Sequence, residues 1–227
     1  MQISEQTRDI LKNFASINES ILLYKGNSIN TTSNAGNVMA KGTILEEFPA
    51  EACIYNLNEL LNTLSLFVDP DLEFNETHLT LSDSDSALNY FFADSSLIDI
   101  PTQTPNMDKL DKVLEFTLTS DALSSLLKSA NVMSLPDLIL VNDDTGLVLR
   151  TTDSKNSTSN NYGKTVGDSP ADLVDFEFRF RTENLKMVAG DYTVTISGKN
   201  GKYISQLVNL NTDLTYWVAL EPGSRCE

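Results

Sequence analysis

The stretch SEQTRDILKNFA, residues 4–15, has a near-copy in SDALSSLLKSAN, residues 120–131. Each copy opens with a serine suited to capping a helix, and an acid follows where the helix dipole favours negative charge. Both then carry apolar residues at helical spacing, which form one stripe for burial. Lys12 in the first copy matches Lys128 in the second. The two stretches predict amphipathic helices that begin two similar halves of the chain.

Two further pairs of segments repeat in the same order. LNYFFA, residues 88–93, matches LTYWVA, residues 214–219, at the leucine, the tyrosine and the final alanine. Between the ends, YNLNELLNTL (55–64) lies at nearly the same offset as FRTENLKMVA (180–189), and each is expected to form a short helix after a strand. The chain is therefore predicted to be an internal duplication: helix, strands, helix, strands, twice.

The joint between the halves is expected in DIPTQTPNMDK, residues 99–109, because its two prolines interrupt regular structure. The predicted domains are residues 1–108 and residues 109–227. The first carries 4 Lys and Arg against 16 Asp and Glu, and the second carries 12 against 16.

Between the predicted helices, apolar and polar residues alternate with a period of two, which is typical of half-buried strands. DFEFRFR, residues 175–181, places three phenylalanines on one face. Strands are also predicted at 72–81, 113–119 and 192–197. Asn200-Gly201 is a hairpin-turn signal, residues 142–146 form a second turn, and residues 151–170 are expected to be an exposed loop or weak hairpin.

Composition limits the class of protein. The 227 residues carry a net charge of −16. If only the total charge of the protein mattered, this charge would disfavour nucleic-acid binding. At physiological salt, however, charges are screened over about 8 Å, so a local basic cluster still acts on a nearby phosphate. No segment has the length or apolar character of a membrane span or signal peptide. Cys53 and Cys226 fit two free thiols in a reducing cytoplasm, and a disulfide between them is the alternative.

Catalytic and metal-binding patterns are not found. His78 is the single histidine, and its alternating context predicts a position on the surface of a strand rather than in a catalytic triad. The acidic segments 69–73 and 82–86 lack the glycine and glutamate of a calcium loop, so we expect solvated turns. The sequence predicts a protein that is not an enzyme and uses no metal or cofactor.

Three segments resemble one family. LKNFASIN (11–18), IYNLNELLNTLSL (54–66) and YWVALE (216–221) are similar to the sliding clamps of T-even-type bacteriophages, which are DNA polymerase processivity factors. The similarity covers the start, the end of the first quarter and the end of the chain, whereas residues 140–175 give no match.

The resemblance implies an α+β protein with the DNA clamp fold. Each subunit would have two similar domains with two helices each, and three subunits would close head to tail into a homotrimeric ring. Helices would line the hole and antiparallel sheets would lie outside. The family has no catalytic activity. A clamp loader driven by ATP places the ring on double-stranded DNA, and the polymerase docks by a C-terminal peptide. A link to late transcription and a location in the cytoplasm of the infected bacterial host follow from the same resemblance.

A ring that slides should contact phosphates without reading bases. Sparse, long cations on the helices suit this task. The predicted DNA-facing residues are Arg8 and Lys12 on the first helix, Lys128 on its copy, and Arg181 and Lys186 flanking the last predicted helix. The second predicted helix carries no cation, so uneven contact is expected.

For the peptide pocket, the resemblance points to the domain joint and the chain end. The predicted pocket residues are Val218, Leu220 and Pro222, with Leu135 and Pro136 after the third helix. Ordinary core or strand-end positions are the alternative for the same residues.

Other classes of protein remain open from the sequence alone. An acidic DNA mimic would use the charge of −16 itself, but basic helices would serve no purpose in it. A virion structural protein would assemble a ring or tube without DNA. A hydrolase is disfavoured because no catalytic constellation is identified.

Overall fold

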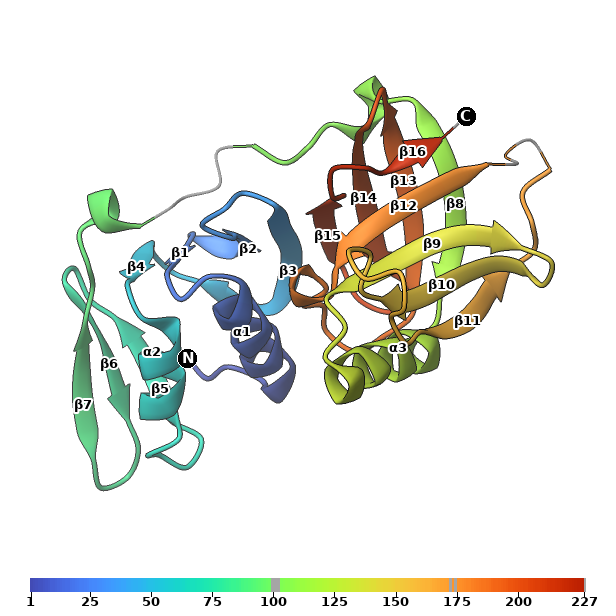
Figure 1. Ribbon diagram of the computed structural model, residues 1–227. Coiled ribbons are helices and arrows are strands. Elements are labelled where there is room, and N and C mark those ends of the chain that lie inside the picture. Colours follow the sequence, from blue (N-terminus) through green and yellow to red (C-terminus); the bar gives the residue numbers. More distant parts are fainter. Residues whose placement is uncertain (99–102, 172, 174, 227) are drawn as a thin grey trace. The chain divides into compact units, whose positions relative to one another are not determined.

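The computed structural model describes residues 1–98, 103–171, 173 and 175–226. The chain forms two compact units, Met1–Thr104 and Pro105–Glu227, and each is described by itself. Residues 99–102 of the predicted joint lie outside the described residues. Figure 1 labels the elements of both units.

The first unit combines two helices with small antiparallel sheets. Its elements are α1 (Glu5–Ile17), β1 (Ile21–Leu23), β2 (Gly26–Thr32), β3 (Val38–Phe48), β4 (Ala52–Ile54), α2 (Leu57–Leu64), β5 (Asp71–Phe74), β6 (His78–Ser82), β7 (Ala87–Phe91) and the 3-10 turn η1 (Ser95–Leu97). Strand β2 pairs with β3, β1 pairs with β4, and β5, β6 and β7 form a three-stranded sheet. Helix α1 packs against β2, β3 and α2 (Figure 1).

The first predicted helix is confirmed. The Ser4 side chain caps α1 by accepting a hydrogen bond from the Thr7 backbone N–H. Ile10, Leu11 and Phe14 are almost completely buried. Burying side chains of this size contributes about 1.5–3 kcal/mol each relative to exposure, so packing rather than helix propensity holds α1 in place.

A carboxylate from another element completes the N-terminus of α1. Glu46 on β3 accepts hydrogen bonds from the Ser4 backbone N–H and the Thr7 hydroxyl. Partial burial alone would raise the pKa of Glu46, but these hydrogen bonds outweigh it and hold the pKa below the ordinary value of 4.5. The charged form of Glu46 therefore ties α1 to β3.

We expect Glu46→Gln to lower the free energy of unfolding by about 1–2 kcal/mol at neutral pH, because hydrogen bonds to a charged acceptor are lost. Since the folded pKa of Glu46 is lowered, its contribution is present above pH 4.5 and is lost as the pH falls through the folded pKa. Urea unfolding at pH 7 and at pH 3 measures both values. A difference between wild type and variant that does not shrink at pH 3 would contradict this role.

The predicted strand 72–81 is wrong as a single element. It folds as the hairpin of β5 and β6, and the Asn75 backbone N–H donates to the His78 carbonyl at 3.0 Å. The Asn75 side chain also donates to the Thr80 hydroxyl at 3.1 Å. Asparagine stabilises turns through such local bonds, and this competed with the alternating pattern.

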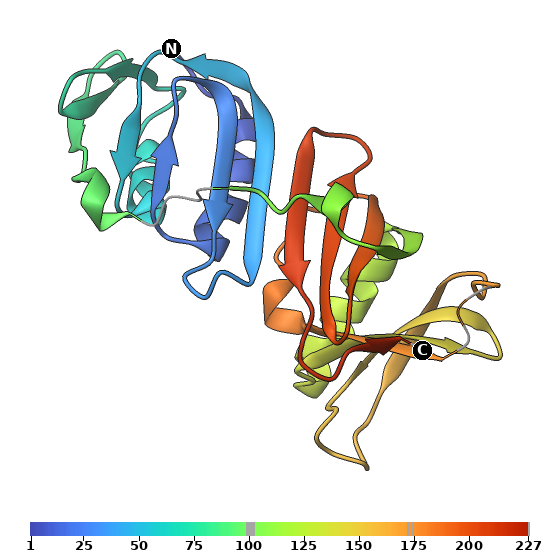
Figure 2. The ribbon, with the colours of Figure 1, turned by 90° about the horizontal axis from the view of Figure 1, so that it is seen from above.

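The second unit has one α-helix and two larger antiparallel sheets. Its elements are the 3-10 turn η2 (Met107–Lys109), β8 (Lys112–Leu118), α3 (Ser120–Met133), β9 (Asp137–Asp143), β10 (Gly146–Thr152), β11 (Tyr162–Gly167), β12 (Phe176–Arg181), the 3-10 turn η3 (Thr182–Asn184), β13 (Tyr192–Lys199), β14 (Lys202–Asn209), β15 (Leu214–Ala219) and β16 (Arg225–Cys226). One sheet runs β8, β13, β14, β15, and the other runs β11, β10, β9, β12, β16. Strands β13, β14 and β15 lie side by side in Figure 2, and α3 packs on β10 and β11.

The strand predictions in this unit are confirmed. Phe176, Phe178 and Phe180 of β12 are buried on one face. Asn200 and Gly201 turn the β13–β14 hairpin with positive φ of 55° and 77°, as a two-residue hairpin turn requires. Residues 151–170 contain β11, which pairs with β10 as the predicted weak hairpin.

The cap of the third helix is displaced by one residue from its prediction. Thr119 rather than Ser120 caps α3, and its hydroxyl accepts the Ala122 backbone N–H at 3.2 Å. Serine and threonine serve equally as caps, so the sequence could not choose between neighbours.

The displaced cap does not change the match of the buried positions. Counted from the two caps, Lys128 lies one position beyond the equivalent of Lys12. At the predicted offset, however, the buried Thr7, Ile10 and Phe14 correspond to the buried Leu123, Leu126 and Ala130. The pairing of Lys12 with Lys128 therefore stays a prediction.

The predicted helix at 180–189 is also wrong, and with it the expectation of two helices in each domain. Only the turn η3 forms there. The Val188 backbone N–H donates to the Tyr216 hydroxyl, and the Tyr192 hydroxyl donates to the Val188 carbonyl. Two tyrosines, from β13 and β15 of one sheet, thus satisfy the backbone that a helix would have satisfied internally.

A tyrosine acts similarly in the first unit. The Tyr90 hydroxyl on β7 donates to the carbonyl of Asn56, the residue that caps α2, at 3.0 Å. In each unit, the tyrosine of the matched segment therefore anchors the backbone at the second predicted helix. This supports the duplication at the level of specific contacts.

Candidate nucleic-acid interface

The α-helices carry little net charge although the chain is strongly acidic. Three cations face four carboxylates on α1, α2 and α3, whereas the chain has 16 cations and 32 acids. The charged helix residues are Arg8, Lys12, Lys128, Glu5, Asp9, Glu59 and Asp121. The helices, with three cations against four carboxylates, therefore repel a phosphate backbone less than the chain's net charge of −16 suggests.

Two predicted DNA-facing residues have accessible ammonium groups. The Lys12 side chain is 63% exposed and pairs with Asp9 at 3.1 Å along the same helix. Such exposed pairs contribute at most about 1 kcal/mol, so Lys12 can exchange this partner for a phosphate. Lys128 is exposed on α3, and it forms no ion pair within the described part of the chain.

Arg8 is less accessible than Lys12. It is half-buried, and its Nε is buried without a hydrogen-bond partner among the residues that the structure describes. Only the remaining guanidinium nitrogens could reach an anion.

Arg181 belongs to an ion-pair network within the second unit. Its guanidinium lies 2.8 Å from the buried carboxylate of Asp137 and 3.6 Å from Glu221. Asp137 also accepts the Ser154 backbone N–H at 2.9 Å. The expectation that Arg181 and Lys186 flank a helix is wrong, because Arg181 ends β12 and only η3 separates it from the exposed Lys186.

We expect Arg181→Ala to lower the free energy of unfolding by about 2 kcal/mol, because the Asp137 carboxylate stays buried without its cation. The double variant Arg181→Ala with Asp137→Asn should recover part of this loss, since it removes the buried charge. Denaturant unfolding of both variants measures the difference. Unchanged stability of Arg181→Ala would show that Arg181 is available for other contacts.

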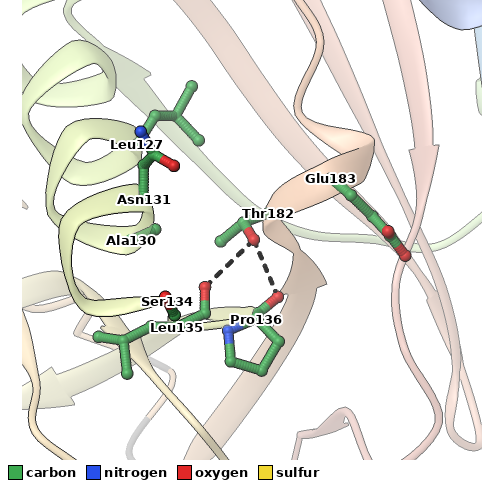
Figure 3. Close-up of a pocket in the computed structure, with 8 residues that line it drawn as sticks. All are labelled: Leu127, Ala130, Asn131, Ser134, Leu135, Pro136, Thr182 and Glu183. Atoms are coloured by element: carbon green, nitrogen blue, oxygen red, sulfur yellow. Dashed lines mark hydrogen bonds between the residues drawn. The ribbon is translucent and has the colours of Figure 1, made fainter.

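The predicted pocket residues divide into two groups. An open hollow of about 440 Å³ lies between the C-terminal end of α3 and the turn η3 (Figure 3). It is lined by Leu127, Ala130, Asn131, Ser134, Leu135, Pro136, Thr182 and Glu183. Leu135 and Pro136 therefore lie together. The Thr182 hydroxyl is within hydrogen-bond distance of both of their carbonyls, at 3.3 and 3.1 Å.

The chain-end residues do not line this hollow. Val218 is buried in β15, Leu220 is half-buried and Pro222 is exposed. A peptide in the hollow of Figure 3 would contact Leu135 and Pro136 but not these three.

Two of the strands that end a sheet, β7 and β11, combine an open edge with an exposed aromatic side chain. In the β5–β6–β7 sheet, the edge of β5 is covered because Met1 and Leu72 exchange hydrogen bonds of 2.9 and 2.7 Å. The outer edge of β7 stays open, and Phe91 is 70% exposed there. In the second unit, β11 is an edge strand with Tyr162 38% exposed. Open edges of this length are templates for pairing with another chain.

Other chemistry has little support in the described residues. No cluster of three His, Cys, Asp or Glu could hold a metal there. His78 lies on β6 beside Phe91, with ring centroids 5.4 Å apart. Burial raises the pKa of the Cys53 and Cys226 thiols. No described helix is long and apolar enough to cross a membrane.

Known structures place the fold in a class. The chain is similar to A. fulgidus PCNA, solved with the C-terminal region of FEN-1, with a TM-score of 0.66, 14% identity, and coverage of 100% of this chain and 98% of that one. This chain forms two units of helix and antiparallel sheet, and its fold is the α+β DNA clamp fold.

Sequence comparison gives the family. The family "DNA polymerase processivity factor" matches residues 4–99, and "gp45 sliding clamp, C terminal" matches residues 115–222. The sliding clamp of Vibrio phage KVP40 is 29% identical, with 97% of this chain and 99% of that one covered. The sliding clamp of Escherichia phage RB69 is 27% identical, with 99% and 98% covered. The chain belongs to the sliding-clamp family of DNA polymerase processivity factors.

Proposed function

We propose that three copies of the chain close head to tail into a ring that encircles duplex DNA and tethers the replicative polymerase. The open edges of β7 and β11 are the observation that carries this proposal. Each unit would serve as one domain of a six-domain ring, and the predicted domain boundary at residues 108 and 109 falls four residues after the boundary of the units. The protein would act without catalysis, in the cytoplasm of the infected bacterial host.

Edge pairing accounts for ring closure. The edges lie in different units, so β7 of one copy can pair with β11 of the next, which is a head-to-tail contact. Such contacts give a closed ring when the rotation per subunit closes. Pairing would remove both edges and cover Phe91 and Tyr162, which are apolar groups left exposed in the single chain.

Weak phosphate contacts account for sliding. A ring stays on DNA by topology, so strong or base-specific contacts would only hinder its movement. Lys12 and Lys128, with a smaller share from Arg8, suit this role because their partners are few and exposed. The acidic remainder of the chain would keep DNA from other surfaces. Lys186 is a weaker candidate, and Arg181 is held by Asp137.

Partner proteins would complete the function. A clamp loader driven by ATP would open the ring, and the polymerase would dock through a C-terminal peptide. The A. fulgidus relative, solved with a C-terminal region of another protein, supports this form of docking. Among the predicted pocket residues, Leu135 and Pro136 line an open hollow that a peptide could enter, whereas Val218 is buried. A role in late transcription would use the same tethering.

Two measurements test the proposal. Light scattering should give three times the chain mass of 25.1 kDa. With the cognate loader, ATP and polymerase, the protein should lengthen the product synthesised per binding event on primed DNA. A monomer that leaves run length unchanged would overturn the proposal. Inhibition of DNA-binding proteins without longer products would favour an acidic DNA mimic.

A further inference from the structure

The turn between β13 and β14 contains the only Asn–Gly pair of the sequence, Asn200-Gly201. Asparagine is a chemically labile residue, because the backbone nitrogen of the next residue can attack its side-chain carbonyl carbon. Glycine in the next position hinders this attack least, since it has no Cβ. The sequence therefore contains one bond at which the protein could modify itself without an enzyme.

Both residues of this pair are accessible in the structure. Asn200 and Gly201 are exposed at the tip of the hairpin, with φ of 55° and 77°. A Cβ at Gly201 would meet no atom within 4 Å, so the turn has room for a ring. The Asn200 side chain forms no hydrogen bond with the residues that the structure describes. It is therefore free to rotate toward the nitrogen of Gly201.

A second asparagine that precedes a small residue is held by its contacts. Asn156 is followed by Ser157, and its side-chain oxygen accepts hydrogen bonds from the backbone N–H and the hydroxyl of Thr158, at 3.0 and 2.9 Å. Both bonds must break before the Ser157 nitrogen can reach the Asn156 side chain. Asn156 thus serves as an internal reference for a protected asparagine.

Two lysines beside the turn favour the attack in two ways. Lys199 and Lys202 are directly opposite each other, as the last pair before the turn, and like charges in this arrangement destabilise a sheet. The turn therefore opens more easily into the backbone conformation that ring closure needs. The attack also requires that the Gly201 nitrogen lose its proton, and nearby cations stabilise the negative charge that results.

Existing ion pairs leave these cations available. Lys199 lies 3.2 Å from Asp111, but the two side chains are 74% and 68% exposed, so the pair is weak. Lys202 forms no ion pair within the described ranges. Asn200 lines a hollow of about 340 Å³ together with Lys199, Lys202 and a third lysine, Lys109. The turn therefore lies in a positive environment on an acidic protein.

We propose that Asn200 deamidates spontaneously in the folded protein. The deprotonated backbone nitrogen of Gly201 forms a bond to the side-chain carbonyl carbon of Asn200, and the side-chain amide group takes up a proton and leaves as ammonia. Water then opens the cyclic imide. Addition at the side-chain carbonyl gives a normal aspartyl linkage, and addition at the main-chain carbonyl gives an isoaspartyl linkage.

Either product changes the hairpin. The new carboxylate lies between Lys199 and Lys202, so it relieves their repulsion and lowers the positive charge at the hollow. The isoaspartyl product also lengthens the main chain of the turn. The hairpin has little room for this, because a Cβ at Gly198 would already clash with the Lys202 carbonyl oxygen. This chemistry needs neither the ring nor a partner, so it stands or falls separately from the proposed function.

The test incubates the full chain at pH 7 and at pH 9, and mass spectrometry of digested samples detects the exchange of an amide for an acid. Asn200 should convert about tenfold faster than Asn156, whose two hydrogen bonds must break first. The rate should rise with pH, because the attacking nitrogen must lose its proton. Chromatography should separate two products of equal mass.

A variant of the hairpin tests the part assigned to the lysines. Lys199→Gln with Lys202→Gln should slow conversion of Asn200 about threefold, because exposed charges act weakly. The matched control, Lys25→Gln with Lys41→Gln, changes two exposed lysines of the first unit and should convert at the wild-type rate. Equal rates in the hairpin variant and the wild type would contradict this part.

The unfolded chain supplies the decisive comparison. In urea, Asn200 should convert at a rate similar to that in the folded protein, whereas Asn156 should convert faster once its hydrogen bonds are lost. Conversion of Asn200 in the unfolded chain alone would overturn the inference, because the turn would then protect it. Equal conversion of Asn200 and Asn156 in the folded protein would overturn it as well.

Discussion

Lys12→Glu combined with Lys128→Glu is expected to remove most of the salt-dependent attraction between the ring and duplex DNA. Three copies would carry six of these lysines. If all six contact phosphates, wild-type affinity for a short linear duplex should fall about a thousandfold between 50 and 200 mM salt, because each contact releases counterions. The variant should bind weakly with little salt dependence. Loading onto primed DNA should fall in parallel.

The control variant makes the same change of charge at two other lysines. Lys41 on β3 and Lys155 in the turn after β10 are exposed, so Lys41→Glu with Lys155→Glu adds equal negative charge away from the helices. Its salt dependence should match the wild type. The trimer mass should be unchanged in both variants. A wild-type salt slope in Lys12→Glu, Lys128→Glu would show that these lysines do not face the duplex.

Phe91→Asp is expected to break the ring into monomers. Phe91 is 70% exposed at the open edge of β7, and pairing with another copy would bury it. Losing its burial removes about 2 kcal/mol per interface, and an unpaired carboxylate at the same place adds a desolvation penalty. We expect the subunit dissociation constant to rise about a hundredfold or more. Sedimentation over a range of protein concentrations measures this constant.

Leu210→Asp provides the matched control for the edge. Leu210 is 54% exposed between β14 and β15, which belong to a different sheet from β11. This variant should remain trimeric. Thermal unfolding of the Phe91→Asp monomer should stay cooperative, because the ring of Phe91 contacts only His78 among the described aromatic pairs. An intact trimer in Phe91→Asp would exclude β7 from the subunit interface.

Local patterns predicted much of the fold. The apolar stripe of residues 4–15 and the alternation in 175–181 each correspond to an element with the expected buried face. These signals succeed because the repeat of side chains along a helix or strand is a local property. The hairpin at Asn200-Gly201 was predictable for the same reason.

Non-local contacts explain what the sequence did not predict. The helix expected at 180–189 is replaced by a turn because Tyr192 and Tyr216 satisfy the Val188 backbone from other strands. Arg181 is held by Asp137, which lies 44 residues earlier. No local sequence pattern predicts partners that lie so far apart in the chain.

The candidate sites show the same division. Lys12 could be predicted as an exposed cation from the sequence of its own helix, since it lies outside the apolar stripe. The clustering of Lys109, Lys199 and Lys202 at one hollow could not be predicted, because the pairing of β8, β13 and β14 brings these residues together. Its one local signal was the pair of lysines flanking the Asn200-Gly201 turn.

Topological linkage to DNA tests the central claim most directly. The protein is loaded by its cognate loader and ATP onto singly nicked circular DNA, and the amount that co-elutes with DNA in gel filtration is measured before and after one restriction cut. An encircling ring should stay with the closed circle at 200 mM salt and leave once the circle is linear. Equal retention on circular and linear DNA would contradict encirclement and indicate ordinary surface binding.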